Sequence, residues 1–217
     1  MSCKFTKFNL QKILKFPFQF KIFHSMWLIH FSFLMLPLLF SNTSDSKNVD
    51  FEICLSGEEK ELYEIIMVYR SSKKLPQIPF SAKLTKVAQA HARDLAQQYN
   101  FDTDSKCNPH SWSKKGDWTS CCYTNDHKQA QCMWDKPREI ANYEGDGYEI
   151  AYYHSVGAKA KPALEGWQKS KGHNPLLVNL GIWKQIEWKG VGVGIFENYA
   201  VVWFGRIDDP SKIVSCD

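Results

Sequence analysis

The sequence predicts an α+β fold in which helices pack on an antiparallel sheet. Apolar residues recur at helical spacing between residues 56 and 99. Towards the C-terminus, over residues 190–205, the period changes to two, as in strands. Helices that come first and strands that come late are typical of this class rather than of alternating α/β folds.

Residues 1–43 have the composition of an export leader. They contain five lysines and no acidic residue, and residues 26–40 (MWLIHFSFLMLPLLF) form an apolar run of about the length of a signal-peptide core. The run is shorter than the ~20 residues that a transmembrane helix needs. We predict a basic leader with a signal peptide over residues 1–43. An uncleaved signal anchor is the alternative, and only in that case would a membrane be a partner.

The positive charge of the chain lies mainly in this leader. The whole chain has a formal charge of +4, whereas the 174 residues from 44 to 217 carry 22 basic and 23 acidic residues. Since no lysine and arginine cluster marks this part, the composition argues against a nucleic-acid partner. Its length suffices for one domain with a substantial core.

Two helices are predicted in the first part of the domain. Ser56 with Glu59 three residues later is a capping box, and an apolar stripe at helical spacing follows it until Pro76. Ser81 caps a second helix, and His91 lies in the apolar stripe of that helix. We interpret His91 as a hydrogen-bonded core histidine rather than as a ligand.

Residues 100–135 lack a steady period and hold four of the six cysteines that follow the leader. A loop of this length is uncommon in a compact domain unless it is functional or stapled. An even number of cysteines behind an export signal indicates disulfides, so we predict a cysteine-rich insert at about residues 105–136. Cys121 and Cys122 are adjacent and are expected to take different partners, with Cys107 and Cys132 the nearest. A zinc site is the alternative use, although the chain has no CxxC pair.

Two short helices are predicted after the insert. Pro137 suits the first turn of one, and KPALEGWQKS, residues 161–170, forms the other. Gly172 is typical of a helix stop, which would fix His173 on an elbow just beyond it.

The last regular elements are two strands, GVGVGIF (residues 190–196) and YAVVWFG (residues 199–205). The two residues between them fit a hairpin turn, and the small residues of the first strand indicate close packing against another element. Residues 44–56 are predicted to be a flexible lead-in segment and residues 207–217 a C-terminal tail. Cys54 and Cys216 lie near these two ends and could clamp them together.

Three polar residues in this framework form the candidate site. His110 lies in CNPHSWS, Glu149 in GYEIA and His173 in GHNP. A carboxylate in an apolar setting is costly unless it is paired or bound to a cation. Two histidines and one glutamate can bind Zn²⁺ or another divalent cation and leave a coordination position open, or they can form a hydrogen-bonded cluster. Because the chain has no HExxH or GxSxG motif, no catalytic residue is assigned.

These segments resemble the CAP superfamily, which comprises the cysteine-rich secretory proteins, antigen 5 and the plant pathogenesis-related proteins and shares the SCP domain. AQAHARDLA, HSW, GYEIA, GWQKSKGHN and GVGVGIFENYAVVWFG follow one another in the order seen in that family. The resemblance covers about residues 57–206. It implies an α-β-α sandwich with a central antiparallel sheet, and an open cleft in which His173 faces His110 with Glu149 between them.

The sequence departs from the family pattern at the glutamate. Many members read GENI where this chain reads GYEI, so Tyr148 stands at the usual position of the acid and Glu149 is shifted by one residue. A shift of one residue turns a side chain to the opposite face of a strand. The position of Glu149 relative to the cleft is therefore the point that a structure has to decide.

The resemblance implies a secreted, disulfide-stabilised protein in an extracellular or periplasmic location. Its leading interpretation is a binding module, in which the His/Glu cleft holds a divalent metal and receives a lipid, glycan or protein ligand. A metal-assisted hydrolase that uses the same cleft is the alternative. In the family, such a cluster can bind a divalent metal, often Zn²⁺.

Overall fold

The structure, a computed structural model, describes residues 53–99 and 106–216. One compact unit runs from Asn48 to Asp217. The predicted leader and signal peptide lie outside the described residues. Within the described part, none of the helices combines the length and the apolar character needed to cross a membrane.

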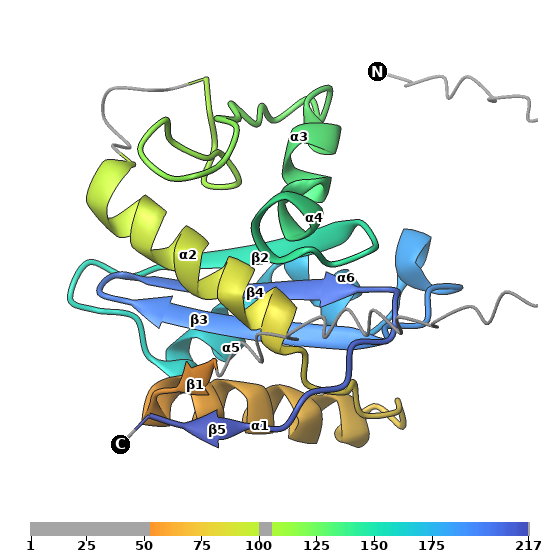
Figure 1. Ribbon diagram of the computed structural model, residues 1–217. Coiled ribbons are helices and arrows are strands. Elements are labelled where there is room, and N and C mark those ends of the chain that lie inside the picture. The colour runs from red at the N-terminus through yellow and green to blue at the C-terminus, as the bar shows by residue number, and fades with distance from the viewer. Residues whose placement is uncertain (1–52, 100–105, 217) are drawn as a thin grey trace, which may run out of the picture. The chain divides into compact units, whose positions relative to one another are not determined.

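A three-stranded antiparallel sheet in the order β2-β4-β3 forms the centre of the domain. β2 is Gly147–Tyr153, β3 is Gly190–Phe196 and β4 is Tyr199–Gly205. β3 and β4 form the predicted hairpin, and β2 pairs with β4 as an edge strand. β4 is buried along its whole length, because helices cover both faces of the sheet (Figure 1).

One face of the sheet packs against α2 (Ala82–Gln98) and shares its apolar core with α3 (Ala130–Trp134) and α4 (Lys136–Ala141). Ser81 caps α2 as predicted, since its hydroxyl accepts a hydrogen bond from the backbone of Leu84. The helix lies close to β3, where a Cβ on Gly192 would come within 2.1 Å of its backbone. The small residues of β3 therefore indicated close packing correctly.

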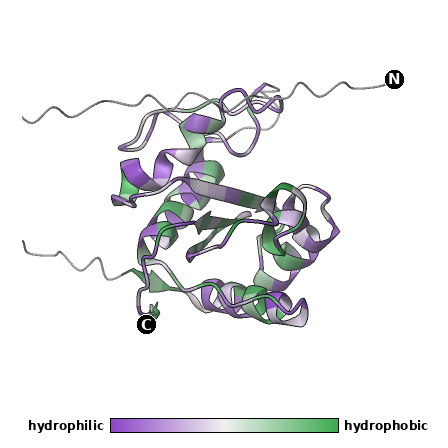
Figure 2. Cartoon of the chain, turned by 90° about the vertical axis from the view of Figure 1, so that its right-hand side faces the viewer, coloured by the Kyte–Doolittle hydropathy of each residue, from purple (hydrophilic) through white to green (hydrophobic). Residues whose placement is uncertain are grey.

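The opposite face packs against α1 (Gly57–Ser72), α5 (Ala160–Lys169) and α6 (His173–Leu177), and Figure 2 shows the layers from the side. Ser56 and Glu59 form the predicted capping box at the start of α1. Trp167 of α5 is almost fully buried in this second core. The fold is thus the α+β class predicted from the sequence, an α-β-α sandwich with a central antiparallel sheet.

The ends of the domain are more ordered than the sequence predicted. β1 (Cys54–Leu55) pairs in parallel with β5 (Val214–Ser215), and Cys54 is bonded to Cys216. The disulfide confirms the predicted clamp. The paired strands lie in the segment 44–56 that was predicted to be flexible and in the predicted tail 207–217. The structure differs from that prediction here, because these paired residues are part of the folded domain.

The other disulfides join Cys107 to Cys122 and Cys121 to Cys132. The adjacent cysteines therefore take different partners, as predicted. Two disulfides therefore cross-link the cysteine-rich insert internally, as expected for a long segment without a steady period.

The interpretation of Gly172 as a left-handed helix stop was wrong. α5 ends at Lys169, and Gly172 has φ −87° and ψ −45° at the start of α6. His173 is the first residue of α6, so a helix start rather than a helix stop fixes its position. A short 3₁₀ helix, η1 (Gly181–Trp183), follows α6.

Candidate functional site

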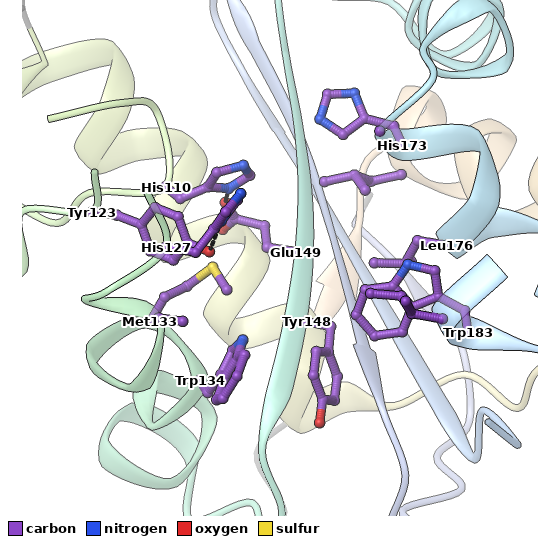
Figure 3. Close-up of a pocket in the computed structure, with 14 residues that line it drawn as sticks. His110, Tyr123, His127, Met133, Trp134, Tyr148, Glu149, His173, Leu176 and Trp183 are labelled. Atoms are coloured by element: carbon purple, nitrogen blue, oxygen red, sulfur yellow. Dashed lines mark hydrogen bonds and ion pairs between the residues drawn. The ribbon is translucent and has the colours of Figure 1, made fainter. Parts of the chain in front are cut away.

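A cavity of about 430 Å³ opens along the edge strand β2. Figure 3 shows β2 passing between two groups of side chains, one from the insert and α3, the other from α6 and η1. The three candidate residues lie at one end of this cavity and large apolar side chains at the other (Figure 3). Its full lining is His110, Tyr123, His127, Ala130, Met133, Trp134, Tyr148, Glu149, Ile150, Gly172, His173, Leu176, Ile182 and Trp183.

The register of β2 decides where the acid points. Tyr148 and Glu149 leave the strand on opposite sides, as neighbouring strand residues do (Figure 3). The carboxylate of Glu149 points to the face covered by α2, and its side chain is fully buried. Tyr148 lies on the side of Trp183, whose ring centroid is 5.2 Å from its own. Both side chains line the cavity, because the cavity reaches around the edge of the sheet.

Both oxygens of Glu149 are held by histidines. Nδ1 of His110 lies 2.6 Å from one oxygen, and Nδ1 of His91 contacts the other. His91 comes from α2 and is completely buried. The sequence interpretation of His91 as a hydrogen-bonded core residue is confirmed, but its partner is the candidate site itself.

The contacts of His91 fix its protons. Its Nε2 lies 3.0 Å from the backbone carbonyl of Ser111, which can only accept, so Nε2 carries a hydrogen. The remaining proton lies between Nδ1 and Glu149. Burial would raise the pKa of Glu149, but the charge of His91 and the hydrogen bonds of both histidines outweigh it and lower that pKa to about 2. The lowered pKa of Glu149 and the raised pKa of His91 both favour a proton on His91.

The surroundings of His91 favour its protonated form relative to a free imidazole. Burial alone would lower its pKa, but the charge and hydrogen bond of Glu149, with the Ser111 carbonyl, raise it. The ring stacks on Trp112 with centroids 4.1 Å apart and planes 8° apart, which places the cation on an aromatic face. A charge-assisted ion pair between α2 and β2 thus lies directly behind the cavity.

The same ion pair orients His110. Because ionised Glu149 can only accept, Nδ1 of His110 is the donor, and a neutral His110 has its free lone pair on Nε2. The loop is fixed as well, since Asn108 accepts from the backbone of His110 through its side chain and donates its own backbone N–H to Tyr123. The structure thereby brings His110 and Glu149 together as a carboxylate–histidine pair.

His173 lies in the same cavity on the other side of β2 (Figure 3). Among the described residues, its ring makes no hydrogen bond or ion pair, and only its backbone bonds to Ser170. Burial and the nearby His110 lower its pKa, while Glu149 acts weakly in the opposite direction. Its imidazole is therefore neutral at pH 7 and can donate or accept one hydrogen bond towards a ligand.

These residues fit a three-ligand metal site incompletely. Across residues 53–99 and 106–216 no group of three or more His, Cys, Asp or Glu is arranged to hold a metal ion. Two imidazoles can turn a nitrogen towards the cavity, but both oxygens of Glu149 are engaged. Glu149 suits the role of a carboxylate that orients a histidine better than the role of a ligand. The metal site of His110, Glu149 and His173 stays a prediction.

Sequence reasoning missed the link between His91 and Glu149. The two residues are 58 positions apart, and only the packing of α2 on the sheet brings them together. A signal was present, however. A histidine in an apolar helical stripe and a glutamate between apolar neighbours are each costly to bury alone, and each is the partner that the other needs.

The fold, the three disulfides and the cavity define a small, disulfide-linked α+β domain. The sequence profile of the cysteine-rich secretory protein family, CAP, matches residues 63–203. This match covers more than half of the chain, and the chain therefore belongs to that family. A comparison with curated proteins found no match.

Two solved structures are similar to this chain. One is an extracellular protein containing an SCP domain from Bacillus anthracis str. Ames, with 20% identity and a TM-score of 0.48. The other is a cysteine-rich secretory protein from Staphylococcus aureus subsp. aureus Mu50, with 14% identity and a TM-score of 0.45. The similarity covers 70% and 69% of this chain but 41% and 38% of those proteins, so the chain spans about two fifths of their length.

Proposed function

We propose that this protein is a secreted binding module whose cavity takes a small amphiphilic ligand of the lipid class. The observation that carries the proposal is the division of the cavity into an apolar part and a polar end (Figure 3). Such concave, mostly apolar sites with a few placed polar groups are typical of small-molecule binding.

The apolar part is built from rings and aliphatic side chains. The ring of Tyr148 lies between those of Trp134, at 5.8 Å, and Trp183, at 5.2 Å. Met133 and Leu176 complete the wall and are buried. A glycan would need polar partners for many hydroxyl groups, and this wall offers few, namely the Tyr148 hydroxyl and the indole N–H groups of Trp134 and Trp183. An acyl or ring-shaped apolar body needs none.

The polar end offers two imidazoles. With Nδ1 donating to Glu149, the neutral form of His110 would present an acceptor at Nε2, and His173 can donate or accept. A hydroxyl or a protonated carboxyl group of a ligand would donate to His110, whose orientation Glu149 holds in advance. The three disulfides agree with export, since they persist in oxidising compartments.

The hydrolase alternative has weaker support. Glu149 is a poor general base, because its pKa is lowered to about 2 and both its oxygens are engaged. His110 would be the better base. A hydrolase could use a serine hydroxyl next to His110 as its nucleophile, and Ser111 is the neighbouring serine in the sequence. Its hydroxyl accepts a hydrogen bond of 2.8 Å from the backbone of Tyr123, so it serves to hold the loop. Binding without turnover is therefore the function that we favour.

Replacing Trp134 with serine is expected to weaken ligand binding at least about tenfold, because a large apolar contact is lost. The probe is cis-parinaric acid, whose fluorescence rises in an apolar site. Trp118→Ser is the matched control, since Trp118 is also half-buried but does not line the cavity. Equal loss in both variants, or no binding by the wild type, would contradict the proposal.

A calorimetric Zn²⁺ titration tests the predicted metal site separately. If His110, Glu149 and His173 all ligate, replacement of any one by alanine abolishes a one-to-one site. The arrangement in the structure instead leads us to expect that Glu149→Gln keeps a one-to-one site with an affinity lowered by about 10- to 100-fold, because Glu149 orients a histidine without binding the metal. If Glu149→Gln loses Zn²⁺ binding as completely as His110→Ala, then the Glu149 carboxylate must break its contacts with the histidines and ligate the metal itself.

A further inference from the structure

The segment around η1 exposes apolar side chains beside the cavity. Ile182 is 84% exposed and Leu180, two residues earlier, is 52% exposed. Between them, Gly181 adopts φ +59°, a conformation that favours glycine. Leu180, Ile182 and the half-buried Trp183 form what we call the apolar tip.

A buried network holds the apolar tip in place. Arg70 of α1 is 2% exposed and donates from one guanidinium nitrogen to the carbonyl of Leu177 and to the side chain of Asn179, at 2.7 and 2.8 Å. Asn179 in turn donates to the carbonyls of Trp183 and Ile186, the latter at 2.7 Å. The base of the tip is thus fixed on both sides, so Leu180 and Ile182 are held out in solvent rather than left free to fold inwards.

The apolar tip is continuous with the cavity. Ile182 and Trp183 line the cavity, and Trp183 packs against Tyr148 inside it. Apolar side chains therefore run from the exposed tip, through Ile182 and Trp183, to the interior of the proposed ligand site. A ligand that leaves an apolar phase at the tip could enter the cavity without crossing water.

Two lysines adjoin lining residues of the cavity in the sequence. Lys171 precedes Gly172, which lines the cavity, and Lys184 follows Trp183. Residues 166–186 hold three lysines and no acidic residue. Lys171 and Lys184 are exposed and make no ion pair within the part of the chain that the structure describes.

A second exposed apolar position, Val156, differs from the apolar tip in the lysines near it. Val156, in the turn after β2, is 86% exposed. The lysines that follow it in sequence, Lys159 and Lys161, pair with Glu58 at 3.1 Å and Glu61 at 3.4 Å. The tip at the cavity mouth therefore combines two strongly exposed aliphatic side chains with neighbouring lysines that make no ion pair among the described residues.

From this combination we infer that the apolar tip is a membrane-docking surface for a bilayer with anionic headgroups. Leu180, Ile182 and Trp183 would enter the interfacial layer, where aliphatic and indole side chains are favoured. Lys171 and Lys184 would meet the anionic headgroups. The inference goes beyond the proposed function, since docking requires no ligand in the cavity, and it differs from the signal-anchor alternative because the folded domain itself makes the contact.

The test is co-flotation with vesicles of phosphatidylcholine and phosphatidylserine, using residues 48–217, the compact unit that contains both cores and all three disulfides. Leu180→Asp is expected to lower the vesicle-bound fraction at least about tenfold, because a charge replaces an inserted apolar side chain. Aspartate is tolerated at this helix-start position, so the fold should persist. Val156→Asp, an equally apolar-to-charged change at an exposed site, is expected to float like the wild type.

A second arm tests the charges and separates this inference from the proposed function. Lys171→Glu with Lys184→Glu is expected to abolish the preference for phosphatidylserine over phosphatidylcholine alone. Leu180 does not line the cavity, so Leu180→Asp should keep cis-parinaric acid binding, whereas Trp134→Ser should lose it and still float. No flotation by the wild type, or equal flotation of Leu180→Asp, would overturn the inference. A dimer that does not float and that Leu180→Asp converts to a monomer would assign the tip to a second copy of the chain.

Discussion

Replacing Glu149 with alanine is expected to lower the free energy of unfolding by about 3–5 kcal/mol, because it leaves a buried charge without its partner. His91 is completely buried and stacked on Trp112, so Glu149 is the acid that balances its charge. Urea unfolding at pH 5.5, followed by tryptophan fluorescence, measures the change. Glu144→Ala is the control, since that glutamate is exposed and should change the free energy by less than about 0.5 kcal/mol.

A double replacement distinguishes loss of the ion pair from general damage. Removal of both charged groups by His91→Phe with Glu149→Met is expected to cost less than Glu149→Ala alone, since an apolar pair of similar volume needs no partner. A double variant that is at least as unstable as the single variant would show that the two residues do not act as a pair.

The pH dependence of this difference follows from the two pKa shifts. Glu149 has a pKa lowered from 4.5 to about 2, so its contribution is present above pH 4.5 and is lost as the pH falls towards 2. His91 has a pKa raised above 6.5, so its contribution is present below pH 6.5 and is lost as the pH rises through the folded-state value. The difference between the wild type and Glu149→Ala should therefore be largest between these two limits. A difference that grows steadily above pH 6.5 would contradict an imidazolium at His91.

The parts of this fold that the sequence predicted well are those with local causes. Ser56 with Glu59, Ser81 and Pro137 mark helix starts through their own neighbouring backbone groups, and the structure confirms all three helices. The late hairpin is also local, because its period of two and its short turn lie within 16 residues. The pairing of Cys54 with Cys216 was predicted for a different reason, namely that the two cysteines lie near the two ends of the domain.

The features of the fold and site that could not be predicted from the sequence depend on long-range packing. β2 was not predicted as a strand, because an edge strand whose side chains line a cavity on both sides lacks a simple alternation of polar and apolar residues. The register of Glu149 depends on that strand, and the role of His91 depends on how α2 crosses the sheet. His110, Glu149 and His173 were correctly expected to meet in one cleft, yet which atoms face each other was outside the reach of the sequence.

Removal of the disulfide between Cys54 and Cys216 is expected to lower the free energy of unfolding by about 2–5 kcal/mol, because it frees the largest loop in the denatured chain. The bond closes a loop with a sequence separation of 162, against 15 for Cys107 and Cys122. Cys54→Ala with Cys216→Ala is the variant, and its unfolding is compared with that of the wild type in urea without reductant. An unchanged midpoint would show that the short β1–β5 pairing closes the domain by itself.

Removal of the disulfide between Cys107 and Cys122 is expected to have the opposite balance of effects, with a smaller loss of stability and a larger loss of ligand binding. Comparing the two double variants tests which disulfide supports the site. The shorter loop between Cys107 and Cys122 predicts a smaller loss of stability, of about 3 kcal/mol or less. His110 lies inside that loop, however, and is held by Asn108 and Tyr123 next to the two cysteines. Cys107→Ala with Cys122→Ala should therefore weaken cis-parinaric acid binding, whereas loss of the terminal clamp should leave it intact, because β1 and β5 do not line the cavity. The reverse order of effects on binding would mean that the insert folds against the sheet without its staple, and that the orientation of His110 depends on Glu149 alone.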